Sequence, residues 1–218
     1  VKGDTDELPF GGDALTFGTS GTDKTEGKFV LKTYYSCYPK IGNLILVNGE
    51  ISTSWNDKNV PGGFKGVAHV RATAKCPFKL STENGRTLRV FADLEGARGT
   101  ALELKQTSGA VGALAVGGDN SNWYGQMIAR EGHTLTFVKP ASAALETTFG
   151  GDAGADVADA WLLGGGTKVV LDGFGSVKAS RRGITVEASG AELNVASGKA
   201  ALYDGQLAGP GELRRTGA

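Results

Sequence analysis

Apolar and polar residues alternate with a period of two along most of this chain. Short runs of this kind recur from residue 14 to residue 214, and Gly, Asn, Asp or Ser separates nearly all of them. Because alternate side chains of a strand point to opposite faces, the pattern predicts strands that bury one face. The turn residues bend the chain at low cost. The predicted strands are 14–17, 28–33, 43–47, 67–72, 87–92, 101–105, 113–116, 126–129, 134–138, 168–171, 184–187, 192–195, 200–203 and 212–214.

A helical pattern is weak throughout. The best candidate for a helix is 153–163, but it carries Asp156 and Asp159 among its apolar residues. A convincing amphipathic helix repeats its apolar positions every 3.6 residues. We therefore expect a turn or two of helix there at most, in a chain that is otherwise all-β.

The spacing of the strands selects among the all-β folds. From residue 84 onward, strands of about three to six residues recur about every 9 to 13 residues, mostly with Gly between them. This spacing is typical of a right-handed parallel β-helix, a solenoid whose coils of roughly 20 to 25 residues stack at about 4.8 Å. The alternative, an antiparallel β-sandwich, favours longer strands joined by Asn-Gly turns, which occur at Asn48-Gly49 and Asn84-Gly85. We predict one solenoid domain over 1–218, with a less regular section or cap over 1–80 and regular coils over 81–218.

Composition narrows the classes of function. The 218 residues carry 23 basic and 23 acidic side chains, so the net charge is zero, and no long-range field draws the chain to nucleic acid or to an anionic membrane. No apolar run approaches the length of a membrane span, and the polar start at Val1 is unlike a secretory signal. The 35 glycines are more than twice the average usage, and we expect them at the bends of the coils.

The cysteines bear on the compartment. The chain has two, Cys37 and Cys76, without a Cys-x-x-Cys or Cys/His cluster, so we expect no zinc site. A disulfide between them would close a loop of about 40 residues and stabilise the fold by roughly 4 kcal/mol on the chain-entropy model. We favour this disulfide, and with it an oxidising compartment, while a pair of buried free thiols stays the alternative.

Two stretches carry a recognisable pattern. Residues 122–135 read NWYGQMIAREGHTL, and residues 209–218 read GPGELRRTGA. The first resembles the autotransporter-associated β-strand repeat, which runs Asn, any residue, Tyr, Gly, a short apolar strand, Gly and a Thr-Leu strand, although the Thr that usually precedes the first glycine is missing. The second is similar to the opening of the same unit, Gly-x-Gly-x-Leu-x-x-x-Gly. The resemblance implies a β-helical stalk in the passenger region of a bacterial surface or secreted protein, with the natural chain continuing beyond Ala218.

The first stretch also has a physical interpretation. Tyr124 and Leu135 are expected to fill the interior of the coil, and Gly125 and Gly132 to form corners that a Cβ atom would crowd. Since neighbours on a strand point to opposite faces, Trp123 is then expected to be exposed.

We find no catalytic constellation in the sequence. The histidines, His69 and His133, are expected to be a solvent-facing strand residue and a turn residue, so no nucleophile has a credible base. The segment 150–157, GGDAGADV, approximates a calcium-binding nonapeptide, but its third Gly comes one residue late and the unit is not repeated. We therefore expect neither a metal site nor a cofactor.

Two glycan-related functions stay open as alternatives. A lyase or glycosidase would need charged groups that converge on one face. Three pairs qualify by spacing, namely Asp93 with Glu95, Glu103 with Lys105, and Lys168 with Asp172. A carbohydrate-binding module would use exposed aromatic rings beside polar groups, for which Trp55 and Trp123 are the candidates, unless both pack in the core or in turns.

Our hypothesis is a non-catalytic, structural or adhesive solenoid segment of a secreted or cell-surface bacterial protein. The stacked coils would hold a surface in place, and corner loops would carry contacts to a host or environmental glycan or protein surface. The identity of that ligand and the oligomeric state are left open.

Overall fold

The computed structural model describes residues 8–9, 14–18, 27–31, 38–53, 62–83, 85–138, 150–152, 154–172, 181–195, 203 and 205–217. These residues form two parallel β-sheets and contain no helix. The first sheet comprises β1 (Leu8–Pro9), β2 (Leu15–Phe17), β4 (Pro39–Leu46), β6 (Gly62–Val70), β8 (Thr87–Glu95), β10 (Ala113–Val116), β12 (Thr134–Val138), β14 (Thr167–Asp172), β16 (Ala191–Val195) and β18 (Leu213–Thr216). The second sheet comprises β3 (Lys28–Leu31), β5 (Glu50–Thr53), β7 (Phe78–Glu83), β9 (Ala101–Ser108), β11 (Gln126–Ala129), β13 (Val157–Leu163), β15 (Arg182–Val186) and β17 (Leu207–Ala208).

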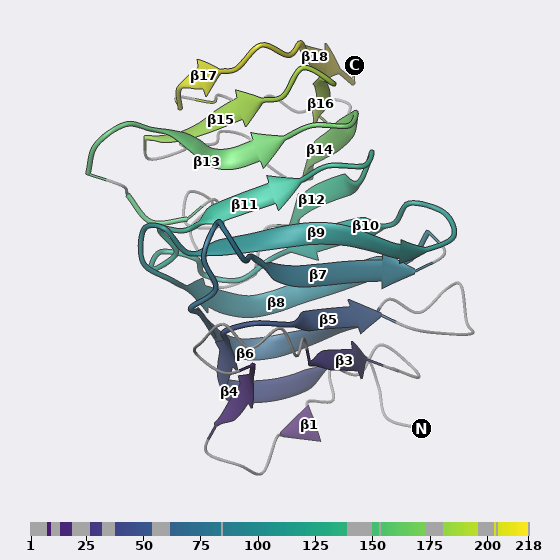
Figure 1. Cartoon of the computed structure of the whole chain (residues 1–218), viewed down its shortest axis with the longest axis vertical. Coiled ribbons are helices and arrows are strands. Elements are labelled where there is room, and N and C mark those ends of the chain that lie inside the picture. Colours follow the sequence, from purple (N-terminus) through teal and green to yellow (C-terminus); the bar gives the residue numbers. More distant parts are fainter. Residues whose placement is uncertain are drawn as a thin grey trace.

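From β3 onward, successive strands alternate between the two sheets, and each pairs in parallel with the strand two places later. In Figure 1 the strands of the second sheet lie in front and run from left to right, and the chain returns through the first sheet behind them while it climbs toward the C-terminus. This winding is a right-handed parallel β-helix, as the spacing predicted. The antiparallel sandwich is excluded because all named strands pair in parallel.

The length of a coil varies along the solenoid. Lys40 pairs with Lys65, and Ala113 pairs with Thr134, so these coils have about the expected 20 to 25 residues. Thr134 pairs with Lys168, which makes that coil 34 residues long. Met127 pairs with Trp161, also 34 residues later, so these two steps are the longest described, and the chain accommodates an insertion there without losing the parallel register.

Apolar ladders run along the interior between the two sheets. Alternation on β8 buries every second side chain, from Leu88 to Leu94. On the second sheet, residues in register stack on one another in the order Phe78, Leu102, Met127, Trp161 and Ile184. Phe137 of the first sheet meets Trp161 edge to face, with ring centroids 4.8 Å apart. Each fully buried large apolar side chain contributes about 1.5–3 kcal/mol, so these ladders are the main stabilising feature of the fold.

Several strands differ from the sequence prediction. The expected short helix within 153–163 is wrong, because Val157–Leu163 forms β13 and inserts Trp161 and Leu163 into the ladders. Pairing with β11 on one side and β15 on the other outweighs local preference there. The strands β1, β5, β7 and β17 were missed. In β5 and β7 the buried residues include Ser52 and Ser81, which pair in register and resemble loop residues in sequence. Of the predicted strand 200–203, all but Tyr203 lies outside the described residues.

The section 1–80 shares its sheets with the rest of the chain. Strand β4 pairs with β6, and β6 pairs with β8 across the expected boundary. Whether the section acts as a cap stays a prediction. None of the described residues forms a helix long and apolar enough to span a membrane.

Candidate functional site

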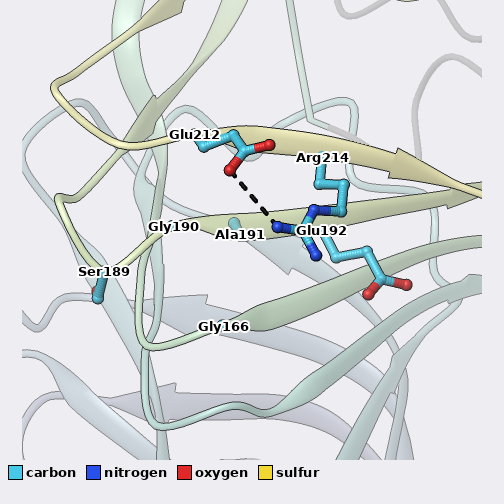
Figure 2. Close-up of a pocket in the computed structure, with 7 residues that line it drawn as sticks. All are labelled: Gly166, Ser189, Gly190, Ala191, Glu192, Glu212 and Arg214. Carbon is cyan, nitrogen blue, oxygen red and sulfur yellow. Dashed lines mark ion pairs between the residues drawn. The ribbon is translucent and has the colours of Figure 1, made fainter.

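A cavity of about 210 Å³ lies near the C-terminal end of the solenoid, where three successive turns stack. Figure 2 shows Glu192, Glu212 and Arg214 around it, with Glu212 paired to Arg214 at 3.6 Å. Glu212 and Arg214 are 71% and 70% exposed, so their pairing is well solvated. Glu192 is already engaged, because Lys168 lies 3.2 Å away and Thr216 donates a hydrogen bond to it. This cavity therefore offers no free charged group for chemistry.

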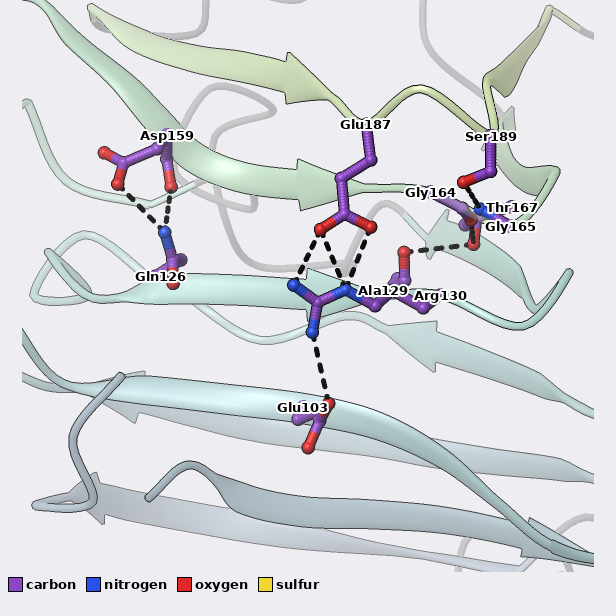
Figure 3. A network of polar contacts seen from close by, with 10 residues as sticks. All are labelled: Glu103, Gln126, Ala129, Arg130, Asp159, Gly164, Gly165, Thr167, Glu187 and Ser189. Carbon is purple, nitrogen blue, oxygen red and sulfur yellow. Dashed lines mark hydrogen bonds and ion pairs between the residues drawn. The ribbon is translucent and has the colours of Figure 1, made fainter. Parts of the chain in front are cut away.

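A polar network crosses the outer face of the second sheet (Figure 3). Arg130, directly after β11, donates from Nε to both carboxylate oxygens of Glu187, at 2.9 and 3.0 Å, and from Nη2 at 2.7 Å. Its Nη1 lies 3.6 Å from Oε1 of Glu103 on β9. The hydrogen bonds to Glu187 raise the pKa of Arg130, and those from Arg130 lower the pKa of Glu187, so both groups stay ionised.

Register explains how these side chains meet. Ala129 pairs with Leu163 and Leu163 pairs with Val186, so residues 130, 164 and 187 follow one another across β11, β13 and β15. Residue 164 is glycine, and a Cβ atom there would lie 2.4 Å from Oε2 of Glu187. Because Gly164 has no side chain, Arg130 and Glu187, which follow strands two places apart, can reach each other.

The charged pairs that the sequence offered for catalysis are engaged along the stack. Oδ1 of Asp93 accepts a hydrogen bond from the backbone N–H of Asp119, at 2.7 Å. Glu95 lies 2.9 Å from Nδ1 of His69, a partly exposed strand residue as expected. Both carboxylates therefore bind neighbouring coils rather than each other.

The other two pairs behave in the same way. Lys105 lies 3.8 Å from Glu131 of the next coil, and Glu103 contacts Arg130 as described above. Lys168 contacts Glu192, also one coil further on. The side chain of Asp172 lies outside the described residues.

A second cavity, of about 240 Å³, lies where β9, β11 and β13 begin. Its polar lining residues are Arg98, Thr100, Tyr124, Gln126 and Asp159. Gln126 donates from Nε2 to the backbone oxygen of Asp159 at 2.9 Å and to Oδ2 at 3.0 Å, as Figure 3 shows. The cavity brings together polar side chains from three consecutive coils.

The turn that carries Arg98 is held rigidly. Thr100 donates to the backbone oxygen of Ala97 from both its N–H and its hydroxyl, at 3.2 and 2.7 Å. Gly99 has a φ of 86°, which favours glycine. The backbone of Tyr124 donates to Gly96 at 2.8 Å, which fixes this turn against the next coil.

The expected placement of Trp123 and Tyr124 is wrong, because the structure inverts it. Trp123 is 1% exposed, whereas Tyr124 is 38% exposed. Trp123 makes an isolated bridge with Gly96, and its indole occupies the space beside Gly96 and Gly125, where Cβ atoms would lie 2.6 and 2.3 Å from ring carbons. The glycine at 125 therefore does relieve crowding, as predicted, but it does so for the tryptophan.

Other predicted residues have these outcomes. Leu135 is buried, as expected. Trp55 and Cys37 lie outside the described residues, so a glycan contact at Trp55 stays a prediction. Cys76 is an exposed free thiol, with Sγ 3.6 Å from Oδ1 of Asn48. The predicted pairing of Cys37 with Cys76 also stays a prediction.

The candidate calcium segment forms an ordinary turn where it is described. Oδ1 of Asp152 accepts a hydrogen bond from the N–H of Gly154, at 2.9 Å, and Asp156 is exposed. Across the described part of the chain, no three His, Cys, Asp or Glu side chains gather as metal ligands would.

Sequence reasoning missed three buried polar residues that shape the corners. Asn120 is 1% exposed and accepts from the N–H of Leu94 at 2.9 Å. Arg182 is 1% exposed and donates to the backbone oxygen of Gly125 at 2.5 Å, and burial lowers its pKa to about 10. His133 is 1% exposed, and burial lowers its pKa. Nothing in the alternation distinguishes these residues from solvated ones.

Comparisons with known proteins leave the family open. No family model, no curated protein and no solved structure matches this chain. The resemblance to the autotransporter-associated repeat therefore stays a prediction.

Proposed function

We propose that this chain is a non-catalytic, adhesive solenoid segment of a secreted or cell-surface bacterial protein. Its work is to hold a stack of coils in shape and to present the outer faces and corners of that stack to a glycan or protein surface. The resemblance of residues 122–135 to a passenger repeat supports the location, and the solenoid fold supports the role of a rigid support.

The observation that carries the proposal is the use made of the charged side chains. Several of them bond laterally to neighbouring coils on the outer faces, as Arg130 does with Glu103 and Glu187. A catalytic site needs charged groups that converge on a space for substrate. Lateral pairing instead stabilises the stack and keeps its surface soluble.

The direction of the pKa shifts supports the same conclusion. Among the described carboxyl groups, Glu187 and Glu192 have lowered pKa values, the first through hydrogen bonds from Arg130 and the second chiefly through one from Thr216. A general acid needs a raised pKa, so that it still carries a proton near neutral pH. These two groups are shifted in the direction opposite to that of a general acid.

Adhesion is tested with the intact chain coupled to beads. The beads are incubated with surfaces coated with glycans or with extracellular proteins, and the bound fraction is counted after washing. We expect retention on at least one coating, and its loss when the same beads are unfolded in guanidinium chloride. Beads that wash off every coating would overturn the adhesive role.

Catalysis is tested on the same coatings and on soluble polysaccharides. New reducing ends and unsaturated uronates are measured after prolonged incubation, and we expect none above the protein-free rate. Product release that disappears in Glu103→Gln, but not in the control Glu212→Gln, which makes the same change in an ion-paired glutamate far from Glu103, would overturn the non-catalytic assignment.

A further inference from the structure

The cavity at the start of β9, β11 and β13 holds a cationic side chain and a carboxylate that do not pair with each other. Arg130 and Lys168 each contact a carboxylate of another coil. Arg98 lines this cavity, and within the described part of the chain its guanidinium has neither a hydrogen bond nor an ion pair. Asp159 lines the same cavity, more than ion-pair distance from Arg98. A free donor group and an acceptor group therefore face one space without satisfying each other.

A break in the sheet register positions Asp159. Val157 pairs with Arg182 and Trp161 pairs with Ile184, so four steps along β13 are matched by two along β15. Such a bulge bends its strand and re-aims the side chains within it. Asp159 and Ala160 lie inside the bulge and form a wall of the cavity. The ladder resumes at Trp161, which keeps its place in the core.

Tyr124 supplies an aromatic surface at the same cavity. Its side chain is 38% exposed, and its ring lies against Gly151, where a Cβ atom would come within 2.7 Å of Cε1. Its backbone is fixed by the hydrogen bond to Gly96, at 2.8 Å. A tyrosine held in this way offers a rigid contact area at low cost in conformational entropy.

The chemistry of the lining restricts the ligand. A guanidinium only donates hydrogen bonds, and an ionised carboxylate only accepts them. An anion would satisfy Arg98 but be repelled by Asp159. A cation would satisfy Asp159 but be repelled by Arg98. Hydroxyl groups both donate and accept, so a polyol satisfies both walls, and the C–H face of a sugar ring packs on an aromatic ring such as that of Tyr124.

The size of the cavity limits the ligand further. Its volume of about 240 Å³ is below the roughly 300–1,000 Å³ that drug-sized ligands need. We propose that this cavity binds a single neutral sugar ring of a glycan, with Arg98 and Asp159 on its hydroxyls and Tyr124 on its apolar face. This inference rests on the proposed adhesive function and places its glycan contact at Tyr124, not at Trp123.

The buried Arg182 holds the wall of this site from behind. It donates from Nη2 to the backbone oxygen of Gly125, at 2.5 Å, and Gly125 lines the cavity. Arg182 itself is 1% exposed. It therefore acts as a positioning residue that fixes the corner beneath Tyr124, and it does not reach the ligand.

The test measures binding of methyl glycosides of neutral hexoses to the intact chain, by saturation-transfer NMR and by calorimetry, with free hexuronic acids as a second arm. We expect a neutral hexoside to bind, and Tyr124→Ala and Asp159→Asn each to weaken its Kd at least tenfold. Tyr124→Phe keeps the ring and is expected to stay within about threefold. Glu212→Gln, a matched change in the other cavity, is expected to leave the Kd unchanged.

Three results would overturn this assignment: no hexoside binds, hexuronic acids alone bind, or affinity survives both Tyr124→Ala and Asp159→Asn. Both residues are at the surface, so we expect the variants to fold, and melting curves check this. The bead assay separates the two proposals. If adhesion persists in the cavity variants, the adhesive function stands and this cavity is not its contact. If the chain binds sugar but its beads adhere to no coating, the sugar site stands and the adhesive function falls.

Discussion

Arg130 and Glu187 are 57 residues apart in the sequence, yet they form a two-pronged ion pair across the strand that separates them. The pair passes over Gly164, whose missing side chain leaves the space that Glu187 occupies. Because each coil repeats the register of the previous one, a single glycine directly after the middle strand is sufficient to let the residues after its two neighbouring strands meet. The solenoid thus brings residues that are distant in the sequence together on its outer face. We call the Arg130–Glu187 ion pair, with Gly164 between its two residues, the clasp.

The strength of this clasp can be measured with a double-mutant cycle. We expect Arg130→Ala and Glu187→Ala to be coupled by about 0.5–1 kcal/mol, the upper range for surface pairs, because the contact is bidentate. The side chains are 41% and 32% exposed, so salt is expected to reduce the coupling. Urea unfolding of the four proteins at low and at high NaCl checks both points. A coupling of zero at low salt would contradict the clasp.

A methyl group at position 164 is expected to break the same clasp. The Cβ atom of Gly164→Ala would lie 2.4 Å from Oε2 and 3.1 Å from Cβ of Glu187, so the carboxylate must move away from Arg130. We expect a loss of about 1 kcal/mol, and we expect Arg130→Ala to cost less in this background than in the natural chain. Gly42→Ala is the matched control, because nothing lies within 4 Å of its Cβ position. It is expected to change stability by less than about 0.5 kcal/mol.

The sequence predicted the fold because the fold depends on repetition. On β8 and β12 every second residue is buried, Leu88 and Leu135 among them. This alternation, with glycine between strands, is visible in the sequence. The strands β5 and β7 were not predicted, because Ser52 and Ser81 are buried there. A buried serine interrupts the apolar alternation on which the prediction depends.

The candidate site was harder to predict because it depends on exceptions to the repeat. Arg98, Tyr124 and Asp159 come from three coils, and the bulge in β13 that turns Asp159 outward breaks the alternation. The order of Trp123 and Tyr124 was inverted because the packing of an indole beside Gly96 and Gly125 is a contact between coils. The structure also shows that the coil containing β13 is unusually long, since Met127 pairs with Trp161.

The two neighbouring aromatic residues are expected to respond in opposite ways to truncation. Trp123→Ala removes a buried indole and is expected to cost about 3–5 kcal/mol. Tyr124→Ala removes a side chain that is 38% exposed and is expected to cost less than about 1 kcal/mol. Chemical denaturation of both variants tests the inversion. A larger loss for Tyr124→Ala would mean that the tyrosine, not the tryptophan, fills the interior.

The state of Cys76 can be determined by labelling. Its thiol is exposed and free, so we expect iodoacetamide to modify it in the folded protein without a reductant. Peptide mass mapping identifies the labelled residue, and Cys76→Ser is the control. Protection of Cys76 until a reductant is added would instead support the disulfide with Cys37 that the sequence predicted.

Acidification below neutral pH is expected to destabilise the protein through His133. The side chain is 1% exposed, and burial lowers its pKa, although the carboxylate of Glu131, 3.6 Å from Nε2, acts in the other direction. The unfolded chain, with a His pKa of about 6.5, then binds a proton more readily than the folded one. Stability is therefore complete above about pH 6.5 and falls as the pH drops toward the folded pKa, with a slope of at most about 1.4 kcal/mol per pH unit.

The contribution of His133 can be separated from that of the carboxyl groups by the range of pH in which it acts. The lowered pKa values of Glu187 and Glu192 also reduce stability in acid, but only near and below the unfolded Glu pKa of about 4.3. Unfolding free energies measured between pH 7.5 and 5.0 are therefore free of the contribution of these two carboxyl groups, and the variant isolates the part due to His133. We expect His133→Gln to flatten the profile in this interval and to leave the fall below pH 4.5 in place. An equally steep profile in the variant would show that His133 is not the group that titrates, because the replacement carries no proton that can be exchanged in this range.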